Sequence, residues 1–146
     1  MNEFRYNTIN LRPSIFLFSV ITLLFCLSCN TSVTGKNDFH TEERILKAFN
    51  SVVIDQKLNL TAHLTEAGEK NRIEFCAQAN IIPLIITTVE NEKLIISSAK
   101  SIDTTTIIDA HIYCSGPVQI ENKGGGVLKF DPNYADQLKS AIEKVN

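Results

Sequence analysis

The feature that most constrains the fold is the alternation of apolar and polar residues from Val52 onward. Successive side chains of a β-strand point to opposite faces, so residues two apart share a face. On both sides of the turn-like run Asp55-Gln56-Lys57, the apolar side chains keep to even positions, namely Val52, Ile54, Leu58, Leu60 and Leu64. The pattern predicts two strands that present one common apolar face.

The chain continues in short β-prone runs separated by turn residues. Apolar residues alternate again at Ile73, Phe75, Ala77 and Ala79, and β-prone runs follow at 81–89, 94–96, 104–114 and 118–121. Such spacing is typical of a β-sandwich, a barrel or a β-solenoid, and no internal repeat chooses among them. We therefore expect an all-β fold, a β-helix-like or sandwich-like stack of short strands.

The C-terminal segment 131–146 has a helical period instead. Asp131 is a good N-cap residue, and Pro132 suits the first helical position. An apolar stripe then recurs at helical spacing through Tyr134, Leu138, Ile142 and Val145. We expect one C-terminal amphipathic helix packed on the β domain, with its stripe serving core packing rather than a partner.

The N-terminal segment is typical of a secretory signal. Arg5 and Arg12 precede Ile15–Leu27, an uncharged apolar run of thirteen residues. A helix of that length spans about 20 Å, less than the roughly 30 Å of a bilayer core. We assign residues 1–28 to a signal peptide of the lipoprotein type, with a plain cleaved signal and an uncleaved anchor helix as the alternatives.

The end of this run, Leu27-Ser28-Cys29, resembles a bacterial lipobox, although Cys26 stands where leucine is usual. Processing there would leave Cys29 as an acylated N-terminus that holds the protein to a membrane. Residues 29–43 are polar and are expected to form a flexible tether. Because Asn30-Thr31-Ser32-Val33 contains no acidic residue, we expect a position at the outer membrane facing the periplasm.

Length and charge exclude two kinds of protein, those with more than one domain and those that bind nucleic acid. A chain of 146 residues holds one domain, and its net charge of −2 gives no basic surface for nucleic acid. The histidines His40, His63 and His111 lack metal-ligand spacing, and Gly124-Gly125-Gly126 lacks a phosphate-loop pattern. We therefore expect no cofactor, no metal and no catalytic residues, and we interpret the glycines as a loop with positive φ angles.

A signal peptide would leave Cys76 and Cys114 in a compartment that permits disulfides. A bridge between them could add about 3–4 kcal/mol of stability. Strand parity argues against it, because Cys114 falls on the apolar face of its strand whereas Cys76 falls with Glu74 and Gln78. The sequence leaves the bridge open.

Residues 44–97 resemble the head GIN domain of auto-transporter adhesins. The likeness rests on Phe49 followed by Val52/Ile54 and Leu58/Leu60, then Arg72-Ile73-Glu74, Asn80-Ile81-Ile82 and Leu94-Ile95-Ile96, in that order. The resemblance implies an all-β, β-helix-like domain of the bacterial cell envelope, over residues 44–130, without established enzymatic activity. This chain differs in its six glycines, which are few for the family, and in ending with a predicted helix.

Three functional hypotheses follow. The first is a non-enzymatic envelope lipoprotein whose β domain binds a protein or glycan partner. The second is a small periplasmic ligand-binding or enzymatic domain with a site near Asp109, His111 and Tyr113, which share one strand face. The third is a structural subunit that stacks on a larger β-solenoid partner through an exposed sheet edge.

Lipid attachment is tested by metabolic labelling of the full chain with a lipid analogue in a bacterial host. We expect label in the wild type and in Cys26→Ala, because Cys26 leaves with the signal, and none in Cys29→Ala. A Cys29→Ala protein that still takes up the label would overturn the assignment.

Overall fold

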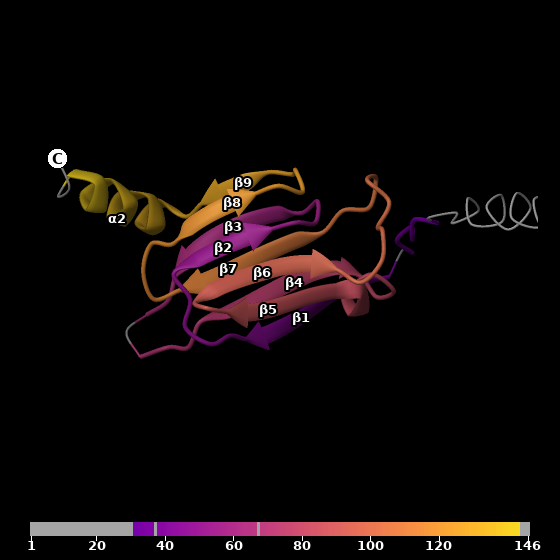
Figure 1. Cartoon of the computed structure of the whole chain (residues 1–146), viewed down its shortest axis with the longest axis horizontal. Coiled ribbons are helices and arrows are strands. Elements are labelled where there is room, and N and C mark those ends of the chain that lie inside the picture. Colours follow the sequence, from indigo (N-terminus) through magenta and orange to yellow (C-terminus); the bar gives the residue numbers. More distant parts are fainter. Residues whose placement is uncertain (1–30, 37, 67, 144–146) are drawn as a thin grey trace, which may run out of the picture. The chain divides into compact units, whose positions relative to one another are not determined.

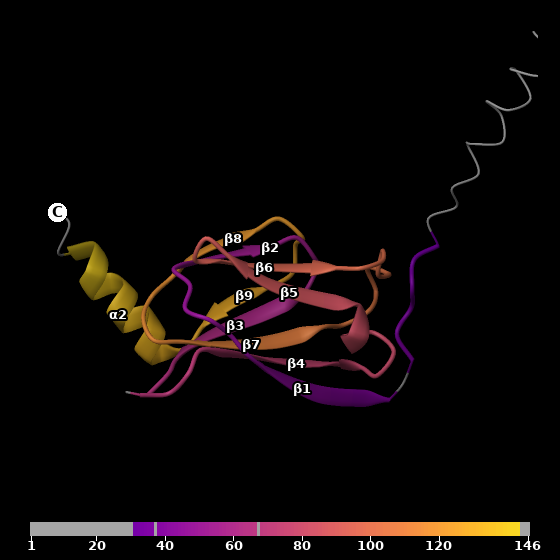
Figure 2. The same cartoon turned by 60° about the horizontal axis from the view of Figure 1, so that its bottom comes forward.

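The computed structural model describes residues 31–36, 38–66 and 68–143, with the backbone alone for 140–143. In this part of the chain the strands lie in two sheets, which form two facing layers in Figure 2. The strands are β1 (Phe39–Ile45), β2 (Ser51–Ile54), β3 (Asn59–Leu64), β4 (Arg72–Gln78), β5 (Ile85–Glu90), β6 (Lys93–Ser98), β7 (Asp109–Cys114), β8 (Gln119–Asn122) and β9 (Leu128–Phe130). A short 3-10 helix, η1 (Ile82–Leu84), precedes β5, and the helix α2 (Pro132–Glu143) follows β9. The predicted all-β fold with one C-terminal helix is confirmed.

Three pairs of consecutive strands each cross from one sheet to the other, and we call each pair an arch. The four-stranded sheet has the order β5-β6-β2-β8, and the five-stranded sheet has the order β1-β4-β7-β3-β9. β2 pairs in parallel with β6 and β8, and β3 pairs in parallel with β7 and β9. The arches β6/β7, β2/β3 and β8/β9 therefore stack on one another in that order (Figure 1). The fold is thus a sandwich built as a stack of arches.

The other end of the stack is antiparallel. β4 and β5 lie beside β7 and β6 and run in the opposite direction to them. β1 pairs with β4 and completes the edge of the five-stranded sheet.

The core lies between the two sheets and is built from aligned side chains. In the four-stranded sheet Val52 lies level with Leu94 and Ile120. In the other sheet Leu60 lies level with Ala110 and Leu128. The alternation seen in the sequence therefore becomes continuous apolar rows that cross the strands. The largest fully buried side chains include Ile54, Leu60, Ile73, Phe75, Leu94, Ile96, Ile108, Ile112 and Tyr134.

The structure differs from expectation in three segments. Residues 39–43, expected within the tether, belong to strand β1, and Val33 forms an isolated bridge with Ile102. The side chains of Phe39–Glu43 are all exposed, so this edge strand leaves no alternating pattern in the sequence. Residues 82–84 form η1 rather than strand, with Pro83 in its first turn, and β7 begins only at Asp109 within the β-prone run 104–114.

Arg44 closes the β1 end of the core. It lies opposite Ile73 in register, so its side chain points between the sheets. Its guanidinium donates to the carbonyls of Ile85 at 2.8 Å and Ile82 at 3.2 Å, and lies 5.1 Å from the ring centre of Phe75. An inward-pointing charge on an edge strand is a known obstacle to further strand pairing.

Helix α2 begins as expected, and its first turn packs on the sheets. The carboxylate of Asp131 accepts from the backbone N–H of Asn133 at 3.0 Å, as an N-cap does. Tyr134 is fully buried, and its hydroxyl accepts from the N–H of Val118 at 2.8 Å and donates to the carbonyl of Val118 at 3.2 Å. Burial raises the pKa of Tyr134, so the hydroxyl stays protonated for both bonds. Leu138 is half-buried, whereas the side chains of Ile142 and Val145 lie outside the described residues.

Among the described residues, no helix is long and apolar enough to cross a membrane.

The glycines at 124–126 form the turn of the last arch, as predicted. Gly125 has φ +78° and Gly126 has φ +101°. A Cβ on Gly126 would overlap the backbone carbonyl of Leu58 in the neighbouring arch. Glycine here satisfies both the backbone conformation and the close approach of two arches.

We expect Gly126→Ala to lower the free energy of unfolding by more than about 2 kcal/mol, because it combines a strained φ with a backbone clash. The matched control is Gly116→Ala, where nothing lies within 4 Å of the added Cβ. Denaturant unfolding measures both, and the control should change by less than about 0.5 kcal/mol. Equal effects would contradict the close approach of the arches.

Candidate functional site

Polar and aromatic side chains gather on the outer surface of the five-stranded sheet. In β7 the buried residues are Ala110, Ile112 and Cys114, so the alternate residues point outward. The register continues these outward positions across β4 and β3. We call this surface the polar face; it comprises Asn59, Thr61, His63, Arg72, Glu74, Cys76, Asp109, His111 and Tyr113, with Lys129 and Asp131 beside them.

One row of the polar face is a stack of three flat groups. Arg72, Tyr113 and His63 are neighbours in register. The Arg72 guanidinium lies 3.9 Å from the ring centre of Tyr113, and the Tyr113 and His63 rings stack with centres 4.8 Å apart. Burial raises the pKa of Tyr113, so its phenol stays protonated and can donate a hydrogen bond. The row is a rigid surface with an apolar body and polar rims.

Three carboxylates hold the Arg72 end of this row. Arg72 forms ion pairs with Glu69 at 3.2 Å, Glu43 at 3.5 Å and Glu74 at 3.6 Å. All three carboxylates are substantially exposed, so the pairs orient the guanidinium more than they stabilise the fold.

The two histidines of the polar face are directly linked. The Nε2 of His63 lies 3.0 Å from the Nδ1 of His111, and the Nδ1 of His63 lies 3.5 Å from a carboxylate oxygen of Asp131. When His63 directs an Nδ1 proton at Asp131, its Nε2 accepts the proton that His111 Nδ1 carries. Asp131 thereby connects the N-cap of α2 to the imidazole pair.

A hollow of about 420 Å³ lies beside the histidine pair. Its polar lining includes Asn59, Asp109, His111 and Lys129, and Cys76 is at its wall. The amide of Asn59 donates to Asp109 at 2.9 Å and accepts from the N–H of Val127 at 3.1 Å. The hollow thus offers fixed hydrogen-bonding groups of both polarities.

The two cysteines do not meet. The thiols of Cys76 and Cys114 are free, with Cys114 buried in the core and Cys76 half-buried on the opposite side of its sheet. The two cysteine side chains therefore point to opposite faces of the five-stranded sheet. Burial raises the pKa of the Cys114 thiol to about 12, which keeps it protonated and unreactive.

Within the described residues, no three His, Cys, Asp or Glu side chains are placed to hold a metal ion.

The structure brings the predicted group Asp109, His111 and Tyr113 onto one surface. Sequence reasoning missed that His63 and Arg72 join it, because only the strand register makes them neighbours. The sequence indicates Asp131 only as a helix cap, whereas the structure also places its carboxylate beside His63. The predicted lipid site Cys29 lies outside the described residues.

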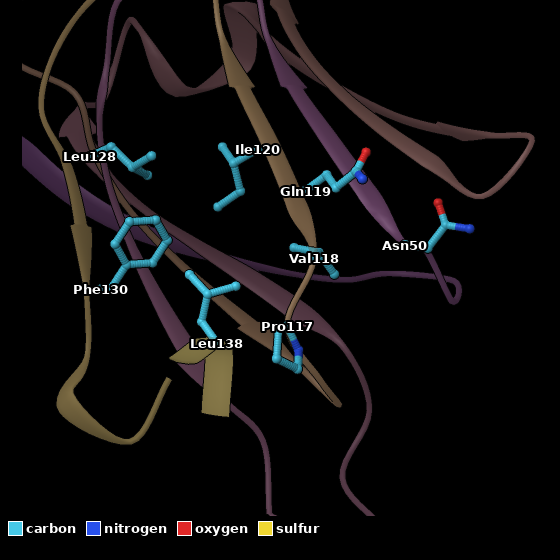
Figure 3. Close-up of a pocket in the computed structure, with 8 residues that line it drawn as sticks. All are labelled: Asn50, Pro117, Val118, Gln119, Ile120, Leu128, Phe130 and Leu138. Carbon is cyan, nitrogen blue, oxygen red and sulfur yellow. The ribbon is translucent and has the colours of Figure 1, made fainter. Parts of the chain in front are cut away.

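A larger hollow of about 710 Å³ lies at the β8/β9 end of the stack, between the last strands of the two sheets (Figure 3). Ile120, Leu128, Phe130 and Leu138 are among its lining residues, with Asn50 and Gln119 at its polar side. It differs from the polar face in chemistry, because most of its lining residues are apolar.

The family described as "Putative auto-transporter adhesin, head GIN domain" matches this chain over residues 48–142. The chain belongs to the head GIN domain family. The matched range contains both hollows and the whole polar face, and it ends one residue before α2 does. Comparison with curated protein sequences finds no significant match.

Solved structures share the head GIN fold at low sequence identity. A putative adhesin from Bacteroides fragilis matches with a TM-score of 0.53 and 17% identity, over 68% of this chain and 45% of that one. A putative adhesin from Parabacteroides merdae matches with a TM-score of 0.51 and 16% identity, over 61% and 38%. A putative lipid binding protein from Parabacteroides distasonis matches with a TM-score of 0.53 and 12% identity, over 69% and 44%. In each case the match spans less than half of the solved chain.

The state of the cysteines is tested by mapping iodoacetamide adducts without reductant. We expect rapid labelling of Cys76 in the native head GIN domain, and labelling of Cys114 only after denaturation, because the Cys114 thiol is buried and protonated. Cys114→Ser should leave the labelling of Cys76 unchanged. A Cys114 that stays unlabelled in the denatured chain until reductant is added would show a bridge.

Proposed function

We propose that this head GIN domain is a non-enzymatic binding module of the bacterial cell envelope, and that its polar face contacts a protein or glycan partner. The observation that carries the proposal is the stacked row of Arg72, Tyr113 and His63 on a rigid sheet surface. Family membership supports an envelope protein related to adhesins.

The chemistry of the row suits recognition. Tyrosine and arginine are enriched in binding sites because they give large contact areas with polar tips. Tyr113 is held by stacking on both sides, and Arg72 is held by its ion pairs, so little conformational entropy is lost when a partner binds. Aromatic surfaces with neighbouring hydrogen-bonding groups suit sugar rings and protein surfaces alike.

The proposal includes attachment to a membrane through an acylated Cys29, with the domain facing the periplasm. The lipobox-like Leu27-Ser28-Cys29 supports this part. One acyl chain binds a membrane only weakly, so stable attachment would require the several chains that lipoprotein processing adds.

A small-ligand site is the second candidate, favoured by the hollow beside His111. Its volume of about 420 Å³ lies within the range of small-molecule pockets. Asp109, Lys129 and the Asn59 amide would orient such a ligand.

Binding is tested with the full chain in lipid vesicles applied to arrays of glycans and proteins. We expect the double variant His63→Ser/Tyr113→Ser to lose at least about 10-fold in binding, because buried aromatic contacts dominate interface energy. The matched control Ile86→Ser/Thr88→Ser changes outward positions of β5 and should bind as the wild type does. Equal binding by the wild type and both variants would contradict the assignment of the polar face. A small ligand in the hollow would instead be lost in Asp109→Asn/Lys129→Met and kept in the His63/Tyr113 variant.

A further inference from the structure

The two ends of the stack of arches differ. At the β1 end, Arg44 points between the sheets and donates to the carbonyls of Ile82 and Ile85, so a charged side chain lies in the gap there. At the β8/β9 end the gap between the sheets is the apolar hollow of about 710 Å³ (Figure 3). β8 and β9 lie together along one edge of the stack, and α2 extends to the side (Figure 1).

Both strands at this end are unpaired on one side. Within the described residues, β8 pairs with β2 alone and β9 pairs with β3 alone. Phe130 is 40% exposed and Val127 is 52% exposed, and Ile120 and Leu128 are only partly buried. The end combines two open strand edges with an incomplete core.

The backbone direction of each edge residue follows from its bonds to the inner strand. The N–H of Gln119 donates to the carbonyl of Asn50, just before β2, at 3.2 Å, and the N–H of Lys123 donates to the carbonyl of Ile54 in β2 at 2.9 Å. The carbonyl of Val127 accepts from Leu60 and the N–H of Asp131 donates to Ala62, both across the β3 side. Because backbone groups alternate along a strand, those of Ile120 and Leu128 point outward from the stack.

We propose that a second copy of this chain covers the β8/β9 end, with a two-fold axis that runs through both sheets. Ile120 pairs with Ile120 of the second copy, and Leu128 pairs with Leu128 of the second copy, each as a hydrogen-bonded antiparallel pair. Ile120 and Leu128 pair with Val52 and Leu60 of the adjacent arch, which each lie four residues from Gln56 in the connecting turn. The proposal therefore places both pairs on one axis. The inward side chains of the two copies then form one continuous core.

The charges at the edge fit this arrangement. In the same register, the carboxylate of Glu121 faces the Gln119 amide of the second copy, which can donate to it. Lys129 faces Val127 of the second copy, so no like charges oppose one another. A two-fold contact uses the β8/β9 end of both copies, so a filament could grow only through a second contact at the β1 end. Arg44 opposes strand pairing there, so the assembly stops at a dimer.

The register is tested by disulfide trapping between two tagged full-length chains that are co-expressed, one carrying Gln119→Cys and the other Glu121→Cys. Both residues are exposed, so the fold tolerates the changes. They would form a non-hydrogen-bonded pair about 4.5 Å apart between Cα atoms, within the range of a disulfide. We expect at least about 5-fold more cross-linked heterodimer than with Gln119→Cys in both chains.

The matched control is the pair Ile86→Cys and Thr88→Cys on β5, the opposite edge of the same sheet, which should give no more cross-link than the single-variant background. Trapping no stronger than this control would overturn the proposal, and so would capture of a different protein by Glu121→Cys. As a second measurement, the mass of the detergent-solubilised full chain should be that of a dimer for the wild type and for Ile86→Lys. The measured mass should halve for Ile120→Lys, with secondary structure retained. A wild type that is monomeric at tens of micromolar would also overturn the proposal.

Discussion

The parallel, in-register stacking of the arches is the constraint on which the rest of this structure depends. Val52 must lie level with Leu94 and Ile120, and Leu60 level with Ala110 and Leu128, for the core to be continuous. A slip of one residue in any arch would turn its apolar side chains outward and place polar ones between the sheets. The tight approach of Gly126 to Leu58 belongs to the same constraint, because it holds the last two arches at one level.

The same register builds the polar face. Along β7, Ala110, Ile112 and Cys114 face the core while Asp109, His111 and Tyr113 face outward. If the polar face binds a partner as proposed, stability and recognition depend on alternate residues of the same strands. A change on the polar face can then occur with little effect on the core, which accords with solved structures that share the fold at less than 20% identity with this chain.

Sequence reasoning succeeded where a side chain's environment is set by its own strand. Alternation identified the faces of β2, β3, β4 and β7, and it placed Asp109, His111 and Tyr113 together. It could not find β1, because Phe39–Glu43 are all exposed and carry no period. It also could not find the contacts of His63 with His111 or of Arg72 with Tyr113, which join residues 48 and 41 positions apart through strand pairing. The order of the strands is likewise set by long-range packing, which a local pattern does not record.

The hydroxyl of Tyr134 joins two parts of the chain that are sixteen residues apart. Its two bonds to Val118 join the residue just before β8 to the helix just after β9, so they close the last arch at its base. On its other side this arch rests on a single neighbour, β2/β3. The segment from Val118 to Tyr134 is thus a closed loop of chain, fastened at its base by one side chain and along its strands by β2 and β3. Because a phenylalanine at position 134 could fill the same space but could not form the two bonds, the hydroxyl rather than the ring joins the two ends of this loop.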